Sequence, residues 1–155
     1  MRNTLLLTLW SRTPVKLQWV IKWLMLPKHL LGVVAVIRNE HNELLLFKHS
    51  YHPHKPWGLP GGWVNAHERP SRAIVREIKE ESGCHVDVIR LLLACESPRR
   101  NHLTVVFLCS QPSGEFVPSA EVTDFRYLPL AEIEAQLEQS QSDIFTEICS
   151  ALNKL

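Results

Sequence analysis

Short apolar runs separated by turn-forming residues are the main pattern of the chain beyond residue 30. The runs predict strands at residues 32–38, 43–49, 86–95, 103–109 and 125–128. A polar turn at residues 39–42 joins the first two, and helical spacing returns at residues 131–138 and 143–152. This order favours an α/β domain in which helices flank a mixed sheet.

A further helix is predicted from Pro70 to Ser82, because proline suits a first turn and the glycine that follows suits the left-handed residue that ends a helix. At 3.6 residues per turn, Glu77, Glu80 and Glu81 fall within an arc of about 100°. The adjoining part of the helix is apolar. One face of this helix is therefore expected to be acidic and its neighbour to join the core.

Carboxylates this close repel one another, and a hard divalent cation would relieve the repulsion. The alternative is a solvated helix face held by a pair between Arg76 and Glu80. The sequence PWGLPGG lies just before the helix, and its glycines allow a tight turn that brings a carbonyl near Gly61 to the same cation. Together these features favour the metal site.

The first thirty residues are additional to this pattern and are expected to form a helical extension, residues 1–30, before a domain at residues 31–155. The stretch from Val15 to Leu26 is apolar around much of a helical circumference and contains Trp19 and Trp23. Such a helix is expected to bury its apolar surface against another structure. We expect it to pack on its own domain first, on a second subunit in a homodimer second, and at a membrane interface third. No transmembrane segment is predicted.

Composition and net charge limit the kinds of binding partner that are expected. The chain has 155 residues, 45% of them hydrophobic and 21% charged, with a net charge of +1, which suits one core and gives no reason to expect a nucleic-acid polymer or an anionic membrane as main partner. The four cysteines lack the spacing of metal ligands, so we expect them to serve as small hydrophobic residues in the core. With no cleavage site in the first ten residues, we expect a cytoplasmic protein.

The acidic helix belongs to a longer pattern, GWVNAHERPSRAIVREIKEESGC, from Gly62 to Cys84. Its skeleton is G-x5-E-x7-R-E-I-x-E-E-x-G, and its seven glycine, glutamate and arginine positions coincide by chance on the order of 10⁻⁹ per starting point. The skeleton resembles the Nudix box, G-x5-E-x7-R-E-U-x-E-E-x-G-U with U aliphatic, and differs only by Cys84 at the last position.

The resemblance implies an α/β/α sandwich with a mixed sheet across about residues 31–152. It also implies a hydrolase that uses Mg²⁺ or Mn²⁺ to cleave the diphosphate linkage of a small nucleotide, either a nucleoside diphosphate joined to another group or a nucleoside triphosphate. The cations would neutralise the diphosphate and lower the pKa of bound water, and a carboxylate would take the proton.

Site residues follow from the resemblance position by position. The implied metal ligands are Gly61, through its carbonyl, and Glu77, Glu80, Glu81 and Glu121. The implied catalytic residues are Glu77, as base or bridging ligand, with Glu80, Arg76, which orients the carboxylates, and Glu68, which supports them. Glu121 matches a late-loop glutamate of the family because it lies six residues before Tyr127; an ordinary surface glutamate is the alternative.

Basic residues provide candidate phosphate contacts. Lys48 and His49 end the second predicted strand, where some Nudix triphosphatases place such residues, and Arg99 and Arg100 lie in a later loop. Ordinary solvated charges are the alternative. His67 stands where the family usually has glycine, and it enters positive φ less readily, so we expect a loop of altered path there.

Three functional classes remain from the sequence. These are a Nudix pyrophosphohydrolase, a Nudix-fold ligand sensor without turnover, and an RNA-end pyrophosphohydrolase. Every glutamate of the box is present, which favours catalysis over sensing. The balanced charge favours a small molecule over RNA. Nothing in the sequence names the substrate.

Overall fold

The structure is a computed structural model and describes residues 4–97 and 101–154. In chain order the elements are α1 (Thr4–Arg12), α2 (Val15–Met25), β1 (Leu30–Ile37), β2 (Leu44–His49), β3 (Trp57–Gly58), β4 (Gly61–Trp63), α3 (Pro70–Ser82), β5 (Val88–Ser97), β6 (His102–Cys109), β7 (Val122–Leu128), α4 (Leu130–Ile133) and α5 (Gln139–Leu152).

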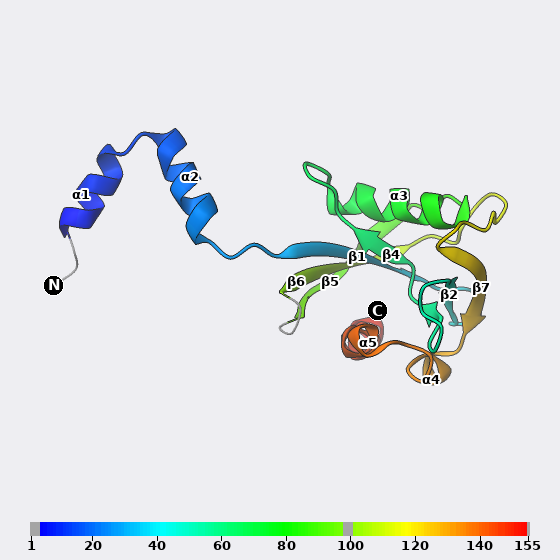
Figure 1. Ribbon diagram of the computed structural model, residues 1–155. Helices are drawn as coiled ribbons and strands as arrows, with labels where there is room; N and C mark the ends of the chain where they lie inside the picture. Colours follow the sequence, from blue (N-terminus) through cyan, green and yellow to red (C-terminus); the bar gives the residue numbers. More distant parts are fainter. Residues whose placement is uncertain (1–3, 98–100, 155) are drawn as a thin grey trace.

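Two sheets form the centre of the domain (Figure 1). The first has the order β4-β1-β6-β5, in which β1 runs parallel to β6 and antiparallel to β4. The second has the order β3-β2-β7, with both pairs antiparallel. The first sheet is mixed, as the order of apolar runs predicts.

Alternation along β1 explains the layers. Val33, Ala35 and Ile37 are buried in a cluster that includes side chains of α3, whereas Val34 and Val36 belong to the cluster of α4 and α5. Figure 1 shows α3 on one side of the sheets and α5 on the other. The α/β/α sandwich is confirmed.

The ends of α3 follow the local signals. Pro70 occupies the first turn, and Gly83 ends the helix with a φ of 72°, in the left-handed region. His67, just before the helix, has a φ of 65°. The side chain therefore does not prevent the left-handed conformation that glycine adopts readily, at a cost on the order of 1 kcal/mol. His67 thus takes the backbone conformation that glycine would take, and the loop need not follow the altered path expected from the histidine.

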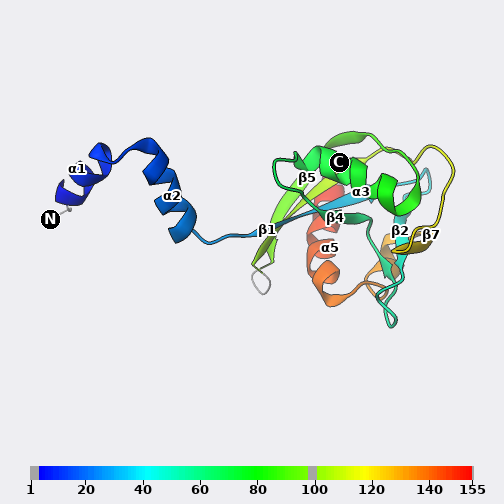
Figure 2. The same ribbon diagram turned by 45° about the horizontal axis from the view of Figure 1, so that its top comes forward.

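The N-terminal helices stand apart from the sandwich, joined to β1 by an extended connection (Figures 1 and 2). Helix α2 has no buried residue. The first expectation for its cover, packing on its own domain, is therefore wrong. None of the described helices has the length and hydropathy needed to cross a bilayer.

Candidate active site

A cleft of about 930 Å³ lies where β1, β4 and the acidic face of α3 meet. Its lining includes Glu77 and Glu81 from α3 and the backbone of Gly61 and Gly62. Glu121, the residue just before β7, reaches the same cleft. Three of the predicted carboxylates are thus brought to one cavity by elements far apart in sequence.

Arg76 is the hub of the acidic residues around this cleft. Its guanidinium donates to both oxygens of Glu68, from Nε and Nη2, each at 2.9 Å. Its Nη1 donates to Glu77 Oε1 and to Glu80 Oε2, also at 2.9 Å, and Nη2 donates to the Trp63 carbonyl at 3.0 Å. Arg76 therefore ties α3 to β4 and orients the carboxylates, as the resemblance implies.

Glu68 is fixed by that arginine rather than turned to the cleft. Hydrogen bonds from Arg76, and a further one from the Asn65 amide, lower the pKa of Glu68 to about 2. The carboxylate is charged at neutral pH and anchors the loop before α3. Its supporting role fits this geometry.

Glu77 is held at the rim of the loop. Its Oε1 accepts hydrogen bonds from Arg76 and from the Trp63 amide, at 3.1 Å for the latter. A side chain at position 62 would overlap the Glu77 carboxylate, so Gly62 makes room for it. These contacts engage one oxygen of Glu77, and none of the described hydrogen bonds uses Oε2.

Glu81 has an unusual environment for a carboxylate. It is only 5% exposed, and within the described part of the chain Oε2 has no hydrogen-bond partner. Burial raises the pKa of Glu81 to about 8, assisted by the charges of Glu77, Glu121 and Glu80 and opposed by a hydrogen bond from the Gly61 amide. A buried carboxylate oxygen without a partner is costly unless a cation compensates it.

The side chains around the cleft are only partly arranged for a metal ion. Among the described residues no group of three acidic, histidine or cysteine side chains is already gathered closely enough to hold a metal ion. Glu80 points to Arg76, and its side chain is 59% exposed. The unpartnered Glu81 oxygen, with Glu77 and Glu121 on the same cleft, nevertheless offers the hard oxygen donors that Mg²⁺ and Mn²⁺ prefer.

The predicted basic contacts fare differently. His49 is 5% exposed, and burial, followed by the charge of His52, lowers its pKa to about 4. Its role as a phosphate contact stays a prediction, and burial disfavours a charged imidazole there. The Lys48 ammonium is 5.9 Å from the Trp57 ring centroid. Neither Lys48 nor His49 is among the residues that line the cleft. Arg99 and Arg100 lie outside the described residues.

Aromatic residues at the cleft were not singled out by the sequence as site residues. Trp63 is 53% exposed and meets the His102 ring edge-on, with centroids 5.7 Å apart. Tyr51 also lines the cleft, and burial, followed by the charges of Glu81, Glu121 and Glu77, raises its pKa. In the sequence, the feature that could have indicated Tyr51 as a site residue is its place among the histidines before the glycine loop.

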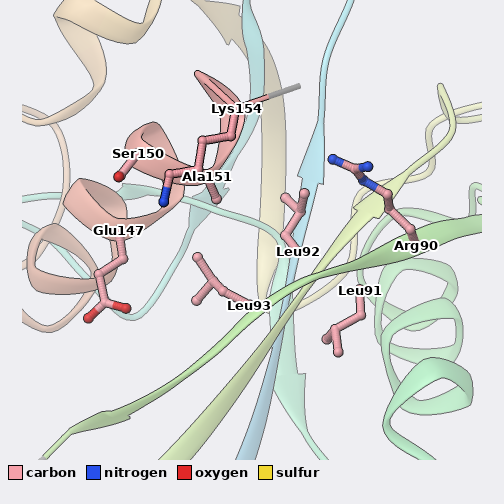
Figure 3. Close-up of a pocket in the computed structure, with 8 residues that line it drawn as sticks. All are labelled: Arg90, Leu91, Leu92, Leu93, Glu147, Ser150, Ala151 and Lys154. Carbon is pink, nitrogen blue, oxygen red and sulfur yellow. The ribbon is translucent and has the colours of Figure 1, made fainter.

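A second hollow, of about 550 Å³, lies between β5 and α5 (Figure 3). Leu92 and Leu93 of β5 face Glu147 and Ala151 of α5 across it. It lacks the carboxylate cluster of the first cleft, so the cleft at α3 is the stronger candidate for the active site.

Comparison with known proteins shows the family of this chain. The family model described as the NUDIX domain matches residues 28–148. A MutT-like protein of Streptomyces ambofaciens is 28% identical over 113 residues, covering 73% of this chain and 72% of that protein. An ADP-ribose pyrophosphatase of Methanocaldococcus jannaschii is 36% identical over 103 residues, covering 60% of this chain and 61% of the relative.

Among solved structures, a UDP-X diphosphatase has a TM-score of 0.66 at 22% identity, covering 96% of this chain and 78% of that one. At this identity the likeness concerns the fold alone. The family model covers most of the chain, and its span includes the acidic helix and the cleft. The chain belongs to the Nudix hydrolase family.

Proposed function

We propose that this protein is a divalent-metal-dependent pyrophosphohydrolase that cleaves the diphosphate linkage of a small nucleotide. The observation that carries the proposal is Glu81, a buried carboxylate whose free oxygen lies in a cleft shared with Glu77 and Glu121. A buried carboxyl group with a raised pKa is typical of a site that is completed by a cation and substrate.

Glu77, Glu81 and Glu121 would hold Mg²⁺ or Mn²⁺, together with the Gly61 carbonyl. The cation would neutralise the diphosphate and lower the pKa of a bound water. Arg76 keeps Glu77 in place through its Oε1, which leaves Oε2 to accept a proton from the attacking water or to bind a cation. Glu80, which pairs with Arg76 at the exposed edge, supports the arrangement in this structure.

The substrate class rests on weaker support. A relative bears the name ADP-ribose pyrophosphatase, and the exposed Trp63 offers a flat apolar surface at the cleft that suits a nucleoside base. We therefore place nucleoside diphosphate derivatives such as ADP-ribose before nucleoside triphosphates.

The test is a panel of both classes, assayed with Mg²⁺ and with Mn²⁺ for released phosphate products. Wild-type protein is compared with Glu81→Gln and with Glu40→Gln, an exposed glutamate of the turn between β1 and β2. Glu81→Gln is expected to reduce turnover of the best substrate by roughly a hundredfold or more, and Glu40→Gln to leave it unchanged. Tight binding of a panel compound without hydrolysis would instead identify a ligand sensor.

A further inference from the structure

The N-terminal arm, residues 4–29, leaves a large apolar surface in water. Both of its helices stand clear of the sandwich in Figures 1 and 2. Trp23, Leu24 and Met25 of α2 are 65%, 65% and 77% exposed. Isolated exposed hydrophobic residues are common, but a continuous apolar helix marks an interaction surface.

Helix α2 is apolar around much of its circumference, but the kinds of side chain differ between its two sides. At about 100° per residue, Leu17, Val20, Leu24 and Met25 fall within an arc of about 140°, which is an aliphatic face. The opposite side has Trp19 and Trp23 between Lys16 and Lys22. An aliphatic side opposed by tryptophan and lysine suits a helix that lies in the plane of a membrane surface.

Charge is distributed unevenly between the arm and the domain. The first 29 residues contain five lysines and arginines and no aspartate or glutamate, whereas residues 30–155 contain 12 basic and 16 acidic residues. The overall charge of +1 conceals this separation. A purely basic arm is complementary to an anionic lipid surface.

Tryptophan and lysine side chains lie together on the arm. The Lys22 ammonium is 5.7 Å from the Trp10 ring centroid and 5.3 Å from that of Trp19. The Lys28 ammonium is 4.2 Å from the ring centroid of Trp23. Indole rings and ammonium groups both favour the headgroup region of a bilayer, where the apolar part of each side chain is buried and its polar end is hydrated.

Pairing of the arms of two copies would be a less favourable way to bury this apolar surface. It would bring the basic residues of both copies together, and the arm has no carboxylate to offset them. We propose that the N-terminal arm docks the protein on the surface of an anionic membrane. The aliphatic face of α2 then lies at the boundary of the acyl chains, and Arg12, Lys16, Lys22 and Lys28 lie against lipid phosphates.

The test is co-sedimentation of the full-length protein with two kinds of vesicle. One is phosphatidylcholine alone, and the other contains about one third phosphatidylglycerol. We expect binding to the anionic vesicles, with a blue shift of tryptophan fluorescence, and weakening as salt is raised. Lys22→Glu should reduce binding roughly tenfold, because it removes one attraction and adds one repulsion.

Lys154→Glu is the matched control, since Lys154 is an exposed lysine after α5, at the other end of the chain. It should bind anionic vesicles like the wild type, and both variants should keep full turnover in solution. The proposal is overturned if the wild type stays in the supernatant with both vesicles, or if Lys22→Glu binds as well as wild type. A two-chain particle by light scattering that does not bind vesicles would assign the arm to a second copy instead.

Discussion

Glu81 combines burial, a free oxygen and proximity to other carboxylates, and this combination distinguishes it from the remaining glutamates of α3. Glu80 is exposed and paired with Arg76, while Glu77 is held by Arg76 and the Trp63 amide. The three glutamates share one helix face in the sequence, yet their environments differ because β1 and β4 cover only part of that face.

A pH dependence of stability follows for the metal-free protein. Because the pKa of Glu81 is raised to about 8 in the folded state, its protonated form favours folding. That contribution is complete below the ordinary glutamate pKa and is lost as pH rises through about 8. The free energy of unfolding should therefore fall between about pH 5 and pH 8, at up to roughly 1.4 kcal/mol per pH unit.

Urea unfolding of chelator-treated protein across this range measures the effect. Glu81→Gln should lose this part of the pH dependence, and saturating Mg²⁺ should diminish it in wild type, because the cation stabilises the charged carboxylate. An identical pH dependence in wild type and Glu81→Gln would contradict the buried environment described for this residue.

At the scale of elements, the short strand β4 positions the helix carboxylates. A methyl group on Gly61 would collide with the Val33 backbone carbonyl of β1, whereas one on Gly62 would meet only the end of the Glu77 side chain. Backbone in a paired strand cannot move aside, but a side-chain terminus can. The two neighbouring glycines therefore serve different purposes.

Alanine substitutions should separate these purposes. Gly61→Ala is expected to destabilise the fold by about 1–3 kcal/mol, as overpacking does. Gly62→Ala should keep the melting temperature close to that of wild type but reduce turnover by roughly tenfold or more, because Glu77 is displaced. Thermal unfolding and turnover of both variants check this; equal loss of stability in the two would contradict it.

Local signals explain which elements the sequence predicts well. Helix α3 has the predicted bounds because proline and glycine mark its two ends. Strands β3 and β4 were not predicted, because pairing with β2 and β1 makes them, and that pairing depends on residues distant in sequence. The predicted helix at residues 131–138 is shortened to α4, and a turn follows from residue 134. Alanine, glutamate, glutamine and leucine favour a helix there, so burial of Ile133 and Leu137 in the core overrides the local preference.

At the scale of the whole molecule, the proposed active site and the proposed membrane-docking arm belong to different parts of the chain. The sandwich brings Glu121, just before β7, to the cleft at the acidic face of α3, and the N-terminal helices extend away from the sandwich (Figure 1). Glu121 reaches the cleft because β7 pairs with β2, and the Ser50 amide donates to the Glu121 carbonyl at 2.8 Å. Spacing within the box could not establish this contribution, since it crosses between the two sheets.

Glu121→Gln tests the part of the site supplied by the second sheet. We expect the Mn²⁺ concentration for half-maximal turnover to rise about tenfold, with no change in melting temperature, because Glu121 is exposed and its side chain lies outside the core. Asp124→Asn, an exposed carboxylate on the same strand, is the control and should leave the metal titration unchanged. Equal titrations for both variants and wild type would remove Glu121 from the site.

The central claim is that the cleft at α3 hydrolyses a diphosphate only with a divalent cation bound by its carboxylates. The most direct measurement is turnover of the best panel substrate by chelator-treated protein as Mg²⁺ or Mn²⁺ is added back. The account predicts no turnover without cation and saturable recovery with it, shifted to much higher cation concentration in Glu81→Gln. Full turnover in the presence of excess chelator, or identical titrations for wild type and Glu81→Gln, would contradict it.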